Sequence, residues 1–232
     1  MGKIGRMDTS QQTKLTIYGT AASRTFRTIW MAKELGLDFS HEPVDFRAGD
    51  TQQDWYLAIN PNGHIPSIRD GDFTLWESFA INLYLSRKYP GSVSPNGLEE
   101  EMTAIQWSIW ALTELNAHCD TILLQSFRPT GQRDAALIAH AFESMRKPMG
   151  VFERHIAAFG WILGGRFTVA DLNVASVIRT LPRIASELPQ ASDEVAAFNK
   201  LSQWLTACLQ RPAAVAASDM QSEAYSAIRR PS

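Results

Sequence analysis

Cysteine is scarce in this sequence, because Cys119 and Cys208 are the only two among 232 residues and neither belongs to a Cys-x-x-Cys motif. This excludes a disulfide scaffold and a cysteine-rich zinc module, and is typical of a reducing compartment. The chain also has no large excess of charge of either sign. Its formal net charge is −2, so no global positive field recruits nucleic acid or anionic membranes. No apolar run approaches the about 18 residues that predict a membrane span. We therefore expect a cytoplasmic protein without a metal, a nucleic-acid partner or a membrane partner.

The chain does contain enough apolar material for two domains. Apolar residues make up 45% of its 232 residues, and chains of this length accommodate two domains of about 100 residues each. Charged residues make up only 20%, which leaves room for apolar surface buried in an oligomer. The N-terminus carries basic residues with no apolar stretch after them, unlike a secretory signal. We expect a disordered leader at 1–13 and a loose tail at 219–232.

Residues 14–90 alternate strand-like and helical patterns. An Asp-Gly pair at 70–71, between two apolar-rich runs, predicts a β-hairpin. The pattern predicts strands at 14–18, 43–46, 67–69 and 73–76, and helices at about 26–37, 54–59 and 77–88. This β-α-β-α-β-β-α order predicts a small mixed sheet with helices on its faces.

A cluster of Gly, Pro, Ser and Asn at 91–98 predicts a linker, after which β-branched runs disappear and helical spacing dominates. A second, all-helical domain is therefore expected over 99–218. Its predicted helices cover 99–126, 133–159 with a kink at Pro148, 168–179 and 195–209.

The segment Asn60-Pro-Asn-Gly-His-Ile-Pro-Ser67 precedes the predicted hairpin. One interpretation is an ordinary surface turn. The other is a cis Ile65–Pro66 peptide that presents the backbone of Ile65 to an extended peptide ligand.

Two further segments carry polar groups at helix starts. Glu77 and Ser78 open a helix, either as capping groups or as a grip on a ligand's ammonium and carboxylate. Ser23, in the loop Tyr18–Arg27, is either an N-cap or a hydroxyl that stabilises a bound thiolate. Neither segment alone distinguishes its two interpretations.

These three segments, in this order, resemble the glutathione S-transferase family, and the serine-type theta- or phi-like members in particular. The resemblance implies an α/β N-terminal thioredoxin-like domain plus an all-α C-terminal helical bundle. Ser23 matches the family's activating serine, and Thr20 is the alternative hydroxyl. No cysteine stands in this loop, so it does not resemble a disulfide-exchanging member.

The second domain carries an independent match at Leu163–Leu172, which resembles the family's N-capping box and hydrophobic staple. Thr168 can cap the N–H of Asp171, and Asp171 can return the bond. We assign both residues a structural role. Trp204–Ala214 resembles the family's closing helix, so the resemblance extends over roughly residues 15–217.

The resemblance implies that glutathione, as co-substrate, lies along the first domain, and that the chain forms a homodimer. The implied glutathione-binding residues are Gln52, Gln53, His64, Ile65, Pro66, Glu77 and Ser78. A small hydrophobic electrophile is expected between the domains, against Ala22, Trp107, Trp110, Thr113, Glu114, Ala117 and His118. Core packing is the alternative for the two tryptophans. Alternative functions are peroxide reduction, ether cleavage, dehalogenation and a non-catalytic interaction role.

Overall fold

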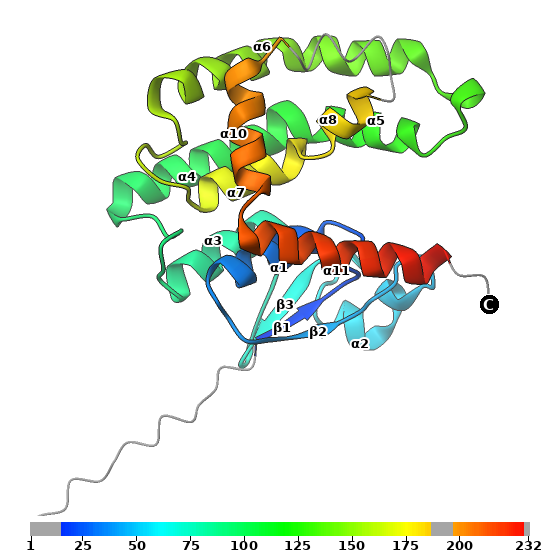
Figure 1. Ribbon diagram of the computed structural model, residues 1–232. Helices are drawn as coiled ribbons and strands as arrows, with labels where there is room; N and C mark the ends of the chain where they lie inside the picture. The colour runs from blue at the N-terminus through cyan, green and yellow to red at the C-terminus, as the bar shows by residue number, and fades with distance from the viewer. Residues whose placement is uncertain (1–14, 187–196, 230–232) are drawn as a thin grey trace, which may run out of the picture.

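The computed structural model describes residues 15–186 and 197–229, which form two halves, and the chain passes from one half to the other at 89–96 and back at 210–211 (Figure 1). The first half holds a four-stranded sheet with helices on its faces, as the predicted order requires. Its elements are β1 (Leu15–Tyr18), α1 (Thr25–Glu34), β2 (Phe39–Glu42), η1 (Asp50–Gln52), α2 (Asp54–Leu57), β3 (Ser67–Asp70), β4 (Phe73–Trp76) and α3 (Ser78–Lys88).

The sheet has the order β2-β1-β3-β4, with β1 parallel to β2 and antiparallel to β3. The predicted hairpin is confirmed as β3 and β4. The predicted strand at 43–46 is wrong, because the second strand is β2, which ends before Pro43. Proline cannot donate to a ladder, and this edge strand reads Phe-Ser-His-Glu, which is too polar to stand out in an apolar pattern.

The rest of the described chain is helical, as expected. Its elements are α4 (Gly97–Ala111), η2 (Leu112–Asn116), α5 (Ala117–Ser126), η3 (Thr130–Gln132), α6 (Ala135–Phe159), α7 (Val169–Ile178), α8 (Leu181–Ser186), α10 (Asn199–Leu209) and α11 (Pro212–Arg229). The predicted helix 99–126 corresponds to α4 and α5, with a π-helical turn between them. Helix α6 continues through Pro148. Residues 195–196 of the last predicted helix lie outside the described residues.

Helix α7 is the buried centre of the helical half, since every residue from Val169 to Ile178 is buried. The predicted capping box at its start is confirmed: Asp171 Oδ2 accepts from the Thr168 N–H at 2.9 Å. Asp171 Oδ1 also accepts from the indole N–H of Trp204 at 2.9 Å and from the N–H of Ile162 at 3.0 Å. One buried carboxylate therefore connects α7, α10 and the loop before α7.

Helix α11 overturns the prediction of a loose tail from 219, because it continues to Arg229 and lies along α1 (Figure 1). Arg211, just before it, donates two hydrogen bonds of 2.7 Å to the carboxylate of Glu34 on α1. The same carboxylate accepts from the indole N–H of Trp30 at 2.9 Å. This largely buried ion pair fixes the start of α11 on the first half.

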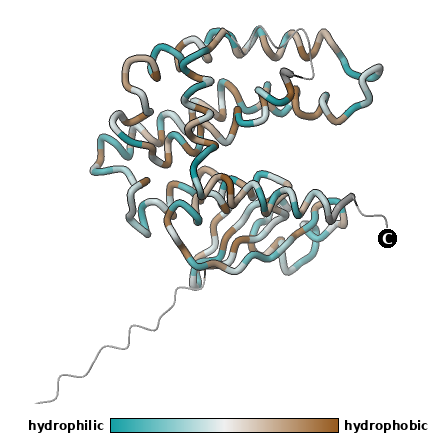
Figure 2. The backbone as a smooth tube through the Cα atoms, in the orientation of Figure 1, coloured by the Kyte–Doolittle hydropathy of each residue, from teal (hydrophilic) through white to brown (hydrophobic). Residues whose placement is uncertain are grey.

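A chain of buried amide and hydroxyl groups also joins the halves. Asn82 on α3 donates to Asn173 on α7 at 2.8 Å, and Asn173 donates to Ser108 on α4 at 2.9 Å. Figure 2 shows the apolar stretches in the strands and in the helices packed around them. No helix in the described ranges has the length and apolar character needed to cross a bilayer.

Candidate functional site

The loop before β3 contains the expected cis Ile65–Pro66 peptide bond. Two side chains hold its backbone, because Tyr56 Oη and Asn60 Nδ2 both donate to the carbonyl of His64 at 2.7 Å. The Tyr56 hydroxyl also lies 2.6 Å from Ser67 Oγ, and burial raises the pKa of Tyr56. The backbone of Ile65 is thus presented by a loop fixed on both sides.

Glu77 and Ser78 stand at the start of α3. Glu77 has φ of 71°, and no other non-glycine residue in the described ranges has a positive φ. Such a backbone costs about 1–3 kcal/mol and is concentrated at functional sites. The side chain of Glu77 is exposed, whereas Ser78 is only 5% exposed. The strained turn therefore places an exposed carboxylate next to a buried hydroxyl.

Sequence reasoning missed a cation behind Ser78. Arg27 on α1 is 6% exposed, and its Nη1 lies 3.5 Å from Ser78 Oγ. Its Nη2 donates to Asn116 Oδ1 at 3.0 Å, and its guanidinium lies 5.1 Å from the centre of the Phe79 ring. Burial lowers the pKa of Arg27 to about 9, and the like charge of Arg24 adds to this effect. No carboxylate in the described part of the chain bonds to it, so a buried positive charge faces Ser78.

The loop between β1 and α1 carries Ser23 at the helix start, as predicted. Ser23 Oγ accepts from the Thr25 N–H at 3.1 Å, lies 3.0 Å from Thr25 Oγ1 and donates to the Thr20 carbonyl at 2.6 Å. The hydroxyl of Thr20 accepts only a long bond, of 3.4 Å, from the N–H of Ala22. Ser23 is half-buried, so its hydroxyl remains within reach of a ligand.

Gly19 brings this loop against the cis-proline loop. Its φ is 128°, and a side-chain carbon there would clash with Thr25 Oγ1 and lie 3.0 Å from Ile65 Cβ. The carbonyl of Gly19 lies 2.7 Å from Nε2 of His41 on β2. The Ser23 loop and Ile65 are therefore neighbours through a position that only glycine fits.

The structure leaves three of the predicted binding side chains at the surface. Gln52, Gln53 and His64 are exposed. The Gln52 amide lies against Gly63, close enough that a side chain at Gly63 would collide with it. Gln52 thus borders the cis-proline loop, and His64 belongs to it.

The predicted electrophile residues divide into two groups. Trp107 and Trp110 pack edge-on at 4.9 Å, and Trp107 lies 5.3 Å from Phe152 and 4.7 Å from His155, ring centre to ring centre. Their contacts support the packing alternative. The other residues do not join this cluster: Thr113, Glu114 and Ala117 are exposed, and Ala22 and His118 are half-buried.

The helix face that meets the first half carries Asn116 and Asp120, which sequence reasoning also missed. Asn116 accepts from Arg27 and donates to Asp120 Oδ2 at 2.9 Å, and Asp120 pairs with Arg24 at 2.5 Å. Their spacing of four residues on a helix was the available signal. This spacing indicates that Asn116 and Asp120 share one face of the helix, but it carries no information about the arginines that lie opposite that face.

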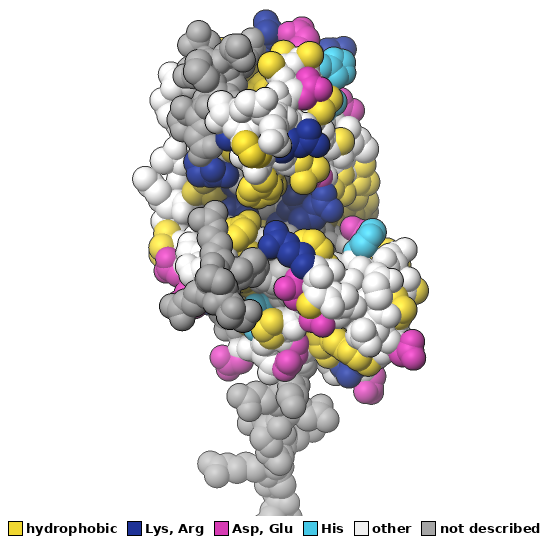
Figure 3. All heavy atoms as spheres, turned by 90° about the vertical axis from the view of Figure 1, so that its right-hand side faces the viewer, with side chains coloured by type: hydrophobic (Ala, Val, Ile, Leu, Met, Phe, Trp, Pro, Cys, Tyr) yellow, Lys and Arg dark blue, Asp and Glu magenta, His cyan; other side chains and the backbone are white. Residues whose placement is uncertain are grey.

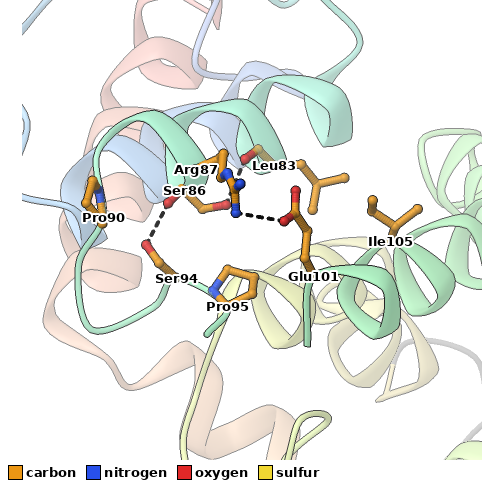
Figure 4. A pocket seen from close by; sticks show the side chains of 8 residues that line it. All are labelled: Leu83, Ser86, Arg87, Pro90, Ser94, Pro95, Glu101 and Ile105. Carbon is orange, nitrogen blue, oxygen red and sulfur yellow. Dashed lines mark hydrogen bonds and ion pairs between the residues drawn. The ribbon is translucent and has the colours of Figure 1, made fainter. Parts of the chain in front are cut away.

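A separate pocket of about 220 Å³ lies between α3 and α4 (Figure 4). The ion pair of Arg87 with Glu101, at 2.8 Å, and the bond from Ser94 Oγ to the Ser86 carbonyl, at 2.7 Å, border it. None of the predicted site residues lines this pocket. Within the described ranges, no group of three or more His, Cys, Asp or Glu side chains could hold a metal.

The fold defines a two-domain protein in which a thioredoxin-like domain with a cluster of polar groups is joined to a helical domain. Models of the glutathione S-transferase N-terminal and C-terminal domains match residues 13–87 and 115–212. Glutathione S-transferase 3 of Zea mays is 34% identical over 206 residues, covering 86% of this chain and 90% of the relative.

Solved structures agree with this assignment. Glutathione transferase F7 from Populus trichocarpa has a TM-score of 0.79 and 26% identity, covering 89% of this chain and 99% of that one. A theta class glutathione S-transferase from Xanthomonas axonopodis pv. citri, with glutathione bound, has a TM-score of 0.76 and 27% identity, covering 87% and 95%. The chain belongs to the glutathione S-transferase family, a family of transferase enzymes.

Proposed function

We propose that the protein conjugates glutathione to a small electrophile, with the thiolate held at Ser23. The observation that carries this proposal is the continuous site made by the Ser23 loop, the cis Ile65–Pro66 loop and the Glu77–Ser78 turn, with Arg27 behind Ser78. Backbone pairing, an acid, a hydroxyl and a buried cation match the functional groups of a γ-glutamyl tripeptide.

Each end of the γ-glutamyl group has a complementary partner in this site. The ammonium fits the exposed carboxylate of Glu77, and the α-carboxylate fits Ser78 with the guanidinium of Arg27 behind it. An anion there would compensate a buried charge that now faces neutral groups. The cysteinyl backbone would pair with Ile65, and the glycyl end would meet Gln52, Gln53 or His64.

The site supplies the chemistry that a thiol nucleophile requires. A neutral thiol reacts poorly, so the enzyme must favour the thiolate. The N-terminus of α1 provides a positive dipole end, and Ser23 provides a hydroxyl. A charge-assisted bond to the thiolate is worth about 1.5–3 kcal/mol, more than the neutral bond that Ser23 now makes to the Thr20 carbonyl. The Ser23 hydroxyl would therefore turn to the sulfur, and Thr20 is the alternative donor.

The protein's own cysteines do not suit a thiol-exchange reaction. Both are free and buried, and burial raises the pKa of Cys119 to about 12 and that of Cys208 well above its usual value. A buried thiol of high pKa is a poor nucleophile. The nucleophile is therefore the thiol of the ligand, and free thiols support a cytoplasmic location.

Calorimetry with glutathione tests whether the protein binds this ligand, and the Glu77→Gly variant tests the role of Glu77 in that binding. Glycine relieves the positive φ, so the melting temperature should rise by about 2–4 °C. Loss of the carboxylate should weaken glutathione binding about tenfold, because an ammonium loses its partner. Glu77→Gln keeps the strained backbone and removes the charge, so it should weaken binding without raising the melting temperature. Unchanged affinity in both variants would contradict the role of Glu77.

We also propose that the chain forms a homodimer through α4. One face of this helix and its π-helical extension presents apolar side chains at spacings of four and three residues, namely Leu98, Met102, Ile105, Ile109 and Leu112. The edge strand β4 exposes Phe73 and Trp76 as well. Contiguous apolar faces of this kind mark interaction sites, and a second copy supplies an equally apolar face.

Sedimentation tests the dimer directly. We expect a species of twice the chain mass of 25.9 kDa, and a monomer for Ile109→Glu, which places a charge within the apolar row. Val215→Glu, at an exposed apolar position on α11, is the matched control and should remain dimeric. A wild-type monomer would exclude this interface.

A further inference from the structure

The hollow between the two halves collects positive charge. Figure 3 shows Lys and Arg side chains gathered there, between apolar patches of the two halves. The charges of Arg24 and Arg179 both act on Arg27, and Arg183 acts on Arg179, so these four arginines share one region. They come from α1 and the residue before it, from the residue after α7 and from α8, which makes the cluster a feature of the assembled fold.

Other groups account for the charges of Arg24 and Arg27. Arg24 pairs with Asp120, and the site proposed above gives Arg27 the α-carboxylate of glutathione. Arg183 contributes positive potential at Arg179. Arg179 itself has no carboxylate among its contacts in the described residues, and it is half-buried.

Arg179 is held in place by neutral groups that lead to the Ser23 loop. Its guanidinium carbon lies 4.0 Å from the centre of the Phe26 ring on α1. Its Nη1 donates to Gln221 Oε1 on α11 at 3.0 Å, and Gln221 Nε2 donates to the Ala21 carbonyl at 3.3 Å. An arginine has five N–H donors in a planar fork, so most of them remain available to an oxyanion.

A half-buried guanidinium that is held in one orientation and has no carboxylate partner in the described residues is suited to bind the anionic group of a ligand. We propose that the second substrate of this enzyme is an anionic electrophile, whose carboxylate or sulfonate group binds Arg179 while its reactive carbon faces the thiolate near Ser23. The apolar patches in the hollow would contact the body of such a substrate. This inference rests on the proposed function and specifies the class of its second substrate.

A matched pair of chloroarenes tests the inference: 4-chloro-3,5-dinitrobenzoate and the neutral 4-chloro-3,5-dinitrobenzamide. In both, the thiolate sulfur forms a bond to the carbon that bears chlorine. Chloride leaves with the electron pair of the C–Cl bond, and the thiol proton goes to solvent. Each kcat/KM is divided by the uncatalysed rate constant for the same compound with glutathione, which removes their difference in intrinsic reactivity.

The wild-type enzyme should prefer the benzoate by about 10- to 100-fold on this normalised scale, as expected for a charge-assisted bond in a partly buried site. Arg179→Gln should bring the ratio close to one, and Arg179→Lys should retain part of it. Arg69→Gln removes an exposed arginine from β3 and should leave the ratio unchanged.

If the normalised kcat/KM values of the wild-type enzyme for the benzoate and the benzamide are equal, the proposal of an anionic second substrate is wrong. This result does not depend on whether any variant folds. In that case conjugation of both compounds would leave the proposed function in place. Failure to conjugate either compound, with no heat on titration of glutathione, would instead overturn the proposed function and this inference with it.

Discussion

Replacing Ser23 with alanine is expected to raise the pKa of the enzyme-bound glutathione thiol by about one to two units and to lower kcat/KM near neutral pH about 10- to 100-fold. The hydrogen bond to the thiolate is worth about 1.5–3 kcal/mol, and about 1.4 kcal/mol corresponds to one pKa unit. The helix dipole at the start of α1 remains in the variant, so part of the activation should survive.

The same substitution removes the acceptor for the Thr25 N–H, so a stability loss of about 1 kcal/mol should accompany the kinetic effect. Measuring kcat/KM against pH separates the two effects, since a structural loss would not displace the pH profile. Thr20→Val is the matched control. If the profile moves in Thr20→Val and stays in place in Ser23→Ala, the donor is Thr20.

Asp171→Ala is expected to lower the free energy of unfolding by about 4 kcal/mol or more. The carboxylate is fully buried and accepts from the indole N–H of Trp204, the N–H of Ile162, and both the N–H and the hydroxyl of Thr168. Alanine would leave these donors buried without an acceptor, each at a cost of about 1–3 kcal/mol before the structure relaxes.

Asp134→Ala is the matched control for Asp171→Ala, because Asp134 caps α6 by accepting from the Leu137 N–H at 3.0 Å but is exposed. Water can replace an exposed cap, so we expect a loss of only about 0.5–2 kcal/mol. Urea unfolding of both variants measures the difference. Equal losses would show that Asp171 acts as an ordinary cap, without the additional role of joining α7 to α10.

The features that the sequence predicted correctly depend on local chemistry. Cis peptides are essentially confined to X-Pro bonds, so Pro66 made the Ile65–Pro66 bond a candidate. The Asp-Gly pair at 70–71 located the hairpin, and Thr168 with Asp171 located the start of α7. In each case the deciding contact lies within a few residues along the chain.

The features that the sequence did not predict depend on contacts between distant segments. Arg27 and Ser78 are 51 residues apart, and Arg24 and Asp120 are 96 apart. Local patterning carries no signal for such pairs. The end of α11 reads as a loose, polar stretch, yet it is helical because α1 provides a surface for Ala214, Ala217 and Gln221 to pack against.

The central claim is that this site binds glutathione and stabilises its thiolate. Ultraviolet absorption of the thiolate, titrated against pH with the wild-type protein and glutathione, measures this directly. We predict that the bound thiol ionises about two pKa units below free glutathione, from the combined effects of the Ser23 hydroxyl and the α1 dipole. A bound thiol with the pKa of free glutathione, or no binding at all, would contradict it.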